Sequence, residues 1–182
     1  MQTKNCKIKA ATYQDIGAMR SMQASALREI GRAFYADTAI ERALVEVGTL
    51  EKATVDEGHY FTVVAETGNI VGTGGWSRQI PEHDAISGHT GFEPDTAVVR
   101  GIFVDPHYAR RGIGKCIMRH IESDAADHGI RVLRLTATLS GTALYESVGY
   151  RSVRPKFLMF SNGTSFESVE MEKAIRSSQM SL

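Results

Sequence analysis

The stretch VVRGIFVDPHYARRGIGK, residues 98–115, decides how the rest of the sequence is interpreted. Its first part is β-branched and aromatic, which predicts a strand over 98–104, and its last part opens a helix at Gly112. Gly101 interrupts the strand, a position typical of a β-bulge. N–H groups at a helix start attract anions, and glycines let a phosphate approach the backbone closely. Five basic residues against one acid between 100 and 119 give a local charge of +4, so we predict an anion-binding loop here.

The rest of the chain carries no such excess of charge. Lys and Arg number 21 and Asp and Glu also number 21, which argues against nucleic acid and against an anionic membrane surface as partners. No run approaches the roughly 18 apolar residues of a membrane span, and the opening residues carry no apolar targeting stretch. Cys6 and Cys116 lie far apart without ligand spacing around them, so no metal site is expected from the cysteines. We expect a cytoplasmic protein.

Outward from this stretch, the pattern predicts an α/β (α+β) fold, a mixed sheet flanked by helices. Strands are expected over 7–11, 60–66, 70–77, 98–104, 132–136, 150–160 and 166–171. Helices are expected over 12–31, 37–48, 112–128 and 141–148. Residues 79–96 form a long connection of the kind that is mobile or functional. Residues 1–182 are interpreted as a single domain with its core at about 7–173 and a loose tail at 177–182.

Two familiar phosphate-binding motifs do not match the loop. The triphosphate P-loop requires a glycine where Ala109 stands and a hydroxyl residue where Cys116 stands. The dinucleotide motif requires a third glycine where Ile117 stands, and about twenty residues further on it requires an acid where Arg131 and Arg134 occur. A nucleotide-binding domain is therefore disfavoured.

Residues 100–115, the helix after them and the segment ALYESVGY, residues 143–150, resemble the GNAT superfamily of acetyl-CoA-dependent N-acetyltransferases. The order of elements matches that fold over residues 8–171, and the specific motifs lie between 98 and 150. The resemblance implies a mixed, mostly antiparallel sheet, acetyl-CoA as co-substrate and a small-molecule or peptide amine as acceptor. A homodimer is compatible with it.

The resemblance also implies which residues hold acetyl-CoA. In the family pattern Q/R-x-x-G-x-G/A, Gly112 and Gly114 match while Ala109 departs at the first position. The pyrophosphate would be held by Arg110, Arg111, Gly112, Ile113, Gly114 and Lys115. The pantetheine arm would bind to the main chain of Ile102, Phe103 and Val104, like an added strand.

Tyr145 occupies the position of the family's general acid in LYxxxG. A phenol with a pKa near 10 can protonate a leaving thiolate whose conjugate acid has a pKa of about 8.5. The other interpretation of Tyr145 is a core aromatic, since Leu144 and Val148 beside it are apolar. Direct transfer to the amine is expected, and an acyl intermediate on Cys116 is the alternative.

The general base stays open. Residues 96–104 contain no carboxylate, where many relatives carry a Glu. Glu93, Asp95, His83 and His89 are the nearby candidates, and a water chain or capture of the neutral amine would serve instead. Thr138 and Ser140 stand in the region where relatives often have an Asn before the short helix.

Two further groups have an ordinary interpretation beside a functional one. His120, Asp124 and His128 recur every fourth residue and resemble metal ligands, but a solvated helix face is the expected role, so no metal is predicted. Trp76, with Phe34, Tyr35 and Phe92, is either the floor of an amine pocket or part of the core. The function predicted is an N-acetyltransferase, and the alternative is a non-catalytic acyl-CoA-binding module or sensor.

Overall fold

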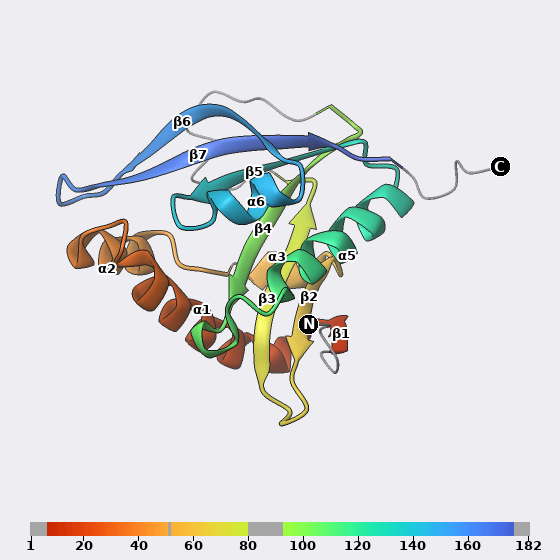
Figure 1. Ribbon diagram of the computed structural model, residues 1–182, viewed down its shortest axis with the longest axis horizontal. Coiled ribbons are helices and arrows are strands. Elements are labelled where there is room, and N and C mark those ends of the chain that lie inside the picture. Colours follow the sequence, from red (N-terminus) through yellow and green to blue (C-terminus); the bar gives the residue numbers. More distant parts are fainter. Residues whose placement is uncertain (1–6, 51, 80–92, 177–182) are drawn as a thin grey trace.

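Seven strands form one sheet in the order β1-β2-β3-β4-β5-β7-β6 in the computed structural model, which describes residues 7–50, 52–79 and 93–176 (Figure 1). β4 and β5 run parallel, and every other neighbouring pair is antiparallel. The prediction of a mixed, mostly antiparallel sheet is confirmed.

The described elements follow the predicted order closely. The strands are β1 (Lys7–Ala10), β2 (Tyr60–Val64), β3 (Ile70–Ser77), β4 (Thr96–Val104), β5 (Val132–Thr138), β6 (Arg151–Met159) and β7 (Ser165–Ala174). The helices are α1 (Ile16–Gly31), α2 (Asp37–Glu46), α3 (Lys52–Asp56), α5 (Ile113–Asp127) and α6 (Thr142–Ser147), with 3₁₀ turns η1 (Tyr13–Asp15) and η2 (Pro106–Tyr108). The sequence did not predict α3, which is a single short turn.

Helices cover both faces of the sheet. Thr73 of β3 contacts α1 through Gln23, while its neighbours Gly72 and Gly74 face α5. Successive residues of a strand point to opposite faces, so α1 and α5 lie on opposite sides. A Cβ at Gly72 would lie 2.9 Å from Ile113 and from Ile117, so glycine here lets α5 pack directly on the strand.

The main core lies between α5 and the sheet. Ile117, Met118 and Ile121 of α5 and Leu133 of β5 are at most 1% exposed. In the described part of the chain, no helix combines the length and the apolar character needed to cross a lipid bilayer.

Candidate active site

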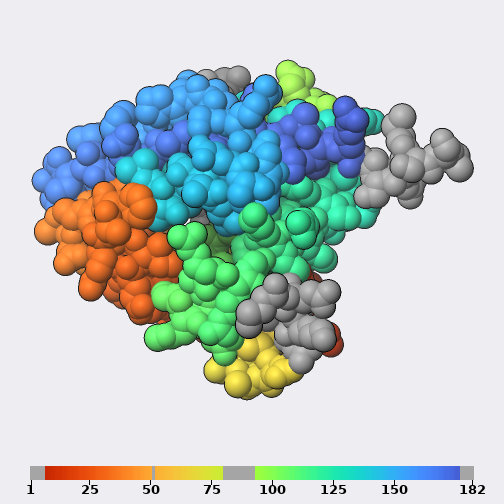
Figure 2. All heavy atoms as spheres, viewed as in Figure 1, coloured from red at the N-terminus to blue at the C-terminus, as the bar shows by residue number. Residues whose placement is uncertain are grey.

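The centre of the sheet is split where β4 and β5 diverge. The two strands pair only from Thr96 with Val132 to Val98 with Arg134, although both continue further. Beyond that point β4 is paired with β3 along one edge alone, which leaves backbone donors and acceptors on the edge that faces β5. A cleft of about 250 Å³ opens along this edge. Figure 2 shows the surface hollowed between the green loop after β4 and the blue atoms of α6.

A bulge at Gly101 accounts for the divergence. Its φ is +60°, and the register with β3 shifts between Thr73 and Gly75. The Gly101 carbonyl accepts hydrogen bonds from the Tyr60 hydroxyl (3.0 Å) and the Thr73 hydroxyl (2.9 Å). A Cβ at Gly101 would collide with the Tyr60 hydroxyl, so only glycine fits here. The predicted bulge is confirmed.

One buried amide orients both hydroxyls. The Gln23 Nε2 donates to Tyr60 Oη (2.9 Å) and to Thr73 Oγ1 (3.0 Å), and all three residues are at most 1% exposed. These bonds join the three residues into one buried network, in which the Gln23 Oε1 has no hydrogen-bond partner among the described residues. The network therefore holds the wall of the cleft, a role that no sequence motif indicated for Gln23.

The loop after β4 presents backbone amides at the start of α5. Gly112 is the N-cap with φ +82°, and the first helical hydrogen bond runs from the Cys116 N–H to the Gly112 carbonyl (3.0 Å). The amides of Ile113, Gly114 and Lys115 precede that bond and point out of the helix end. Together with the positive end of the helix dipole, these amides suit an anion, and their role in binding one stays a prediction.

The basic side chains of this loop are not equivalent. Arg110 and Lys115 are exposed. Arg111 is exposed as well, but its Nη2 donates to the His107 carbonyl (3.0 Å) and its guanidinium lies 4.9 Å from the Tyr108 ring centroid. Arg111 therefore has partners within its own loop, and its role in holding the pyrophosphate stays a prediction.

Glycine is needed at position 114 for a different reason than at position 112. It is buried, and a Cβ there would lie 2.9 Å from the Leu144 Cδ2. The missing side chain thus lets α6 pack on the first turn of α5. This contact sets the position of Tyr145, the next residue of α6, relative to the anion loop.

Tyr145 lines the cleft together with Gly141 and Leu144. The residue is 8% exposed and its ring lies edge-on to that of Tyr150 at 6.0 Å, so it belongs to the core as well. Burial, with a smaller contribution from Tyr60, raises the pKa of Tyr145 well above its ordinary value. Among the residues that the structure describes, none forms a hydrogen bond with its hydroxyl. A neutral phenol with a proton to donate therefore lies at the cleft.

A second cavity of about 270 Å³ adjoins the cleft. It lies between the end of α2, where Ala43 and the following Val47 line it, and the β6–β7 hairpin, which contributes Leu158 and Phe166. The two cavities share the wall residues Leu27, Gly101, Phe103, Thr136 and Thr138. The two cavities are therefore neighbours on either side of these residues.

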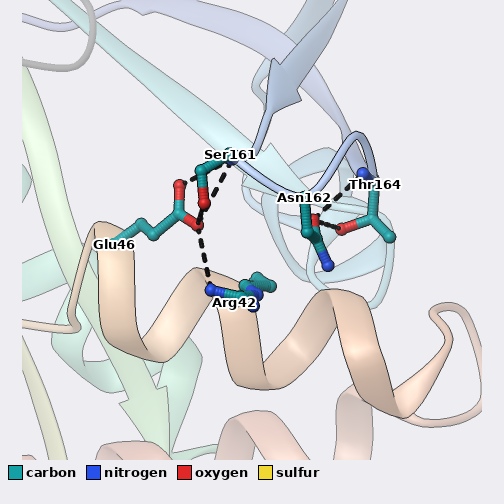
Figure 3. A network of polar contacts seen from close by, with 5 residues as sticks. All are labelled: Arg42, Glu46, Ser161, Asn162 and Thr164. Carbon is teal, nitrogen blue, oxygen red and sulfur yellow. Dashed lines mark hydrogen bonds and ion pairs between the residues drawn. The ribbon is translucent and has the colours of Figure 1, made fainter.

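A polar contact ties the two walls of the second cavity together (Figure 3). The Ser161 hydroxyl donates to Glu46 Oε1 (2.6 Å), and the Ser161 amide donates to Glu46 Oε2 (3.1 Å). Arg42 lies 3.6 Å from the same carboxylate. The Ser161 hydroxyl, followed by its amide, lowers the pKa of Glu46, so this link between α2 and the hairpin is charged at neutral pH.

Comparison with known proteins decides the family. Residues 24–150 match the model of the acetyltransferase (GNAT) family. The chain belongs to that family. The family and the fold that the sequence predicted are therefore confirmed.

Individual relatives are more distant. The ribosomal protein bS18-alanine N-acetyltransferase of Escherichia coli K12 is 36% identical over 59 residues, which cover 31% of this chain and 40% of that protein. The GCN5-related N-acetyltransferase of Rhodopseudomonas palustris superposes with a TM-score of 0.73 at 15% identity, covering 96% of this chain and 99% of the other. The PaiA N-acetyltransferase of Thermoplasma acidophilum in complex with coenzyme A gives 0.68 at 15% identity, covering 93% and 98%. These likenesses show the fold.

The proposed bases of this acetyltransferase lie away from the cleft or outside the described residues. Glu93 and Asp95 are exposed just before β4, and Asp95 is six residues from Gly101, about 20 Å along a strand. His83 and His89 are outside the described residues, as is Phe92. Among the described residues that line the two cavities, none is a carboxylate or an imidazole.

Three other predictions need correction or completion. Cys116 is not among the residues lining the cleft, which disfavours an acyl-cysteine route. Trp76 lies in the core against Asp124 of α5, away from both cavities, so it does not floor an amine pocket. Of its suggested companions, Phe34 is exposed, and Tyr35 stacks on Phe166 at 3.8 Å with its hydroxyl bonded to the Glu167 carbonyl.

The row His120, Asp124, His128 is also not a uniform solvated face. Asp124 accepts a hydrogen bond from the Trp76 indole (2.7 Å) and lies 2.9 Å from His59 Nδ1. His120 packs edge-on against Phe61 at 4.4 Å instead. Helical spacing alone could not show that β2 and β3 place His59 and Trp76 against this row.

Proposed function

We propose that the protein transfers the acetyl group of acetyl-CoA directly to a primary amine. The observation that carries the proposal is the common wall of the two cavities at Gly101, Phe103 and Thr136. With acetyl-CoA in the cleft and an amine in the second cavity, the acyl group and the amine would lie next to each other beside these shared residues.

The residues of the cleft fit acetyl-CoA. The amides of Ile113, Gly114 and Lys115, with Arg110, would bind the pyrophosphate, and the free edge of β4 at 102–104 would bind the pantetheine arm. Acetyl-CoA itself supplies the reactive thioester. The chain's part is to position this group and to exclude water from it.

Tyr145 would protonate the leaving group. The amine nitrogen forms a bond to the acyl carbon, the carbon–sulfur bond breaks, and the sulfur takes the phenolic proton. Burial raises the pKa of Tyr145, so by itself the buried phenol gives up its proton less readily than an exposed phenol would. A thiolate in the same apolar cleft is destabilised for the same reason, which offsets part of this increase.

The amine would react without a general base supplied by the protein. With no carboxylate or imidazole among the described lining residues, acceptors that are already partly neutral are favoured. At pH 7 roughly one in ten α-amines is neutral, because their pKa is about 7.7–8.0, against about one in 2,500 lysine side chains. The apolar walls of the second cavity disfavour a second ammonium group in the acceptor. We therefore infer an acceptor with one α-amine on an apolar residue.

The test combines binding and turnover. Acetyl-CoA should bind and raise the melting temperature, and magnesium-ATP should do neither. Release of CoA should then be followed with a peptide that begins with a free alanine, an N-blocked peptide with one lysine, and spermidine. We expect turnover with the first alone, with kcat/KM rising with pH up to the pKa of the acceptor. Acetyl-CoA binding without turnover on any amine would favour the non-catalytic sensor. A rise of kcat/KM with pH at a value that does not follow the pKa of the acceptor would show that the protein supplies a general base.

A further inference from the structure

The far end of α5 carries a second cluster of chemically active side chains. Asp124 is eleven residues after Ile113, about 16 Å along the helix from the anion loop. It meets His59, which precedes β2, and His128, which follows α5. One ligand atom from each of these three residues lies within 4.8 Å of the others.

The carboxylate and one imidazole are held in place. The Trp76 indole donates to Asp124 Oδ2 at 2.7 Å, and the His59 ring stacks on the indole with centroids 4.1 Å apart. Trp76 is 1% exposed, so this support is rigid. Hydrogen bonds that orient ligating side chains in this way are typical of protein metal sites.

The second imidazole has a defined tautomer. His128 Nδ1 lies 2.8 Å from the Asp124 carbonyl oxygen, which can only accept a hydrogen bond. His128 Nδ1 therefore carries the proton, and Nε2 keeps its lone pair. An imidazole that donates one N–H to a backbone carbonyl and offers the other nitrogen is the usual arrangement of a metal-binding histidine.

We propose that His59, Asp124 and His128 bind a divalent transition metal ion of the Zn²⁺ type. Two imidazoles and one carboxylate suit such ions and do not suit Ca²⁺ or Mg²⁺, which prefer oxygen ligands. Ligand atoms around a tetrahedral zinc ion lie about 3.3 Å apart, given bonds of about 2.0–2.1 Å, so ligand atoms that lie up to 4.8 Å apart must close by up to about 1.5 Å. His128 makes this movement, because its side chain is 49% exposed at the helix end.

The positive charge of Arg78 beside the cluster limits its affinity for a metal ion to a moderate value. The Arg78 guanidinium donates to the carbonyls of Pro94 and His128, at 2.6 and 2.7 Å, and so lies close to the cluster. Its positive charge opposes that of the ion. The bound ion would link the start of β2 to the end of α5 and stabilise the folded state, while acetyl-CoA binding at the other end of α5 stays unchanged.

The single tryptophan of the chain makes the test direct, since Trp76 touches both Asp124 and His59. Untagged protein should be titrated with Co²⁺ while Trp76 fluorescence is followed, and Zn²⁺ should then be added as a competitor. We expect saturable quenching with one ion per chain, reversal by Zn²⁺, and a melting temperature raised by Zn²⁺.

Matched variants identify the ligands. His128→Ala, at an exposed position, and His59→Ala should each weaken Co²⁺ binding at least tenfold, while His120→Ala on the same helix should leave it unchanged. Circular dichroism checks that each variant is folded. Quenching that never saturates, or that is equal in the parent and in His128→Ala, would overturn the site.

Discussion

The cofactor cleft and the second cavity share a wall but are built from different material. The cleft is formed largely by one continuous part of the chain, residues 99–145, and its important groups are backbone amides and glycines. The second cavity draws side chains from Leu27 in α1 to Ser168 in β7 and is closed by the Glu46–Ser161 contact. A site made of backbone needs a fixed local geometry, whereas a site made of side chains changes its shape with each substitution. The cleft is therefore suited to one common ligand and the cavity to a particular acceptor.

Tyr145→Phe should have the largest effect, because it removes the proposed proton donor from the cleft. The phenyl ring keeps the contact with Tyr150, so acetyl-CoA affinity should stay within a few-fold. We expect kcat to fall by about 10²–10⁴, the contribution of a positioned acid. Steady-state kinetics and calorimetry on the same preparation measure the two quantities. An unchanged kcat would remove Tyr145 from the mechanism.

Gly112→Val should act on the cleft alone. At φ +82° a β-branched residue is strained by about 1–3 kcal/mol, and relief of that strain would turn the amides away from the phosphate. We expect acetyl-CoA affinity to fall about tenfold to a hundredfold in calorimetric titrations. Gly68→Val is the matched control, since Gly68 has φ +86° and open space around it in the β2–β3 turn. If both variants bind acetyl-CoA equally well, the phosphates lie elsewhere.

Tyr60→Phe should show how firmly the common wall is held. It removes one of the two hydroxyl donors to the Gly101 carbonyl and leaves one buried N–H of Gln23 without its acceptor. We expect a loss of about 1–2 kcal/mol in the free energy of unfolding, measured in urea. Tyr13→Phe, at a residue that is 54% exposed, should change nothing. A Tyr60→Phe protein as stable as the parent would mean that the bulge does not depend on this network.

The difference between the two cavities also explains what the sequence could predict. Strand-loop-helix patterns are local, so the bulge at Gly101 and the amides after Gly112 followed from neighbouring residues. The support for that bulge did not, because Gln23, Tyr60 and Thr73 are 13 to 50 residues apart and meet only in the folded sheet. For the same reason the sequence did not show that Gly114 also makes room for Leu144, a contact that comes from tertiary packing.

Side-chain partners were the least predictable part. Arg111 has the right charge for a phosphate, and its own loop also offers it the His107 carbonyl and the Tyr108 ring as partners. Asp124 has the spacing of a solvated helix face, yet Trp76 and His59 arrive from β3 and from the segment before β2. Sequence periodicity fixes which face of a helix is apolar, but it does not specify which distant residues the polar positions meet.

The smallest expected effect concerns the second cavity alone and comes from Ser161→Ala. This change removes the hydroxyl bond to Glu46 but leaves the Ser161 amide bond, so the walls of the cavity loosen without opening. We expect the KM for the amine to rise two- to threefold, about the weight of one exposed charge-assisted contact, while the KM for acetyl-CoA stays constant. Thr164→Ala is the control, because it breaks only the bond to Asn162 in the same turn.

The pH dependence of the Ser161→Ala effect follows from the direction in which the pKa of Glu46 is shifted. The pKa of Glu46 is lowered in the folded protein, so the contact is intact at neutral pH and is lost only as the pH falls through that lowered value. The KM difference between Ser161→Ala and the parent should therefore be constant between about pH 6 and 9. If the difference in the KM for the amine disappears within this pH range, or if the KM for acetyl-CoA changes equally, the Glu46–Ser161 contact does not act on the second cavity alone.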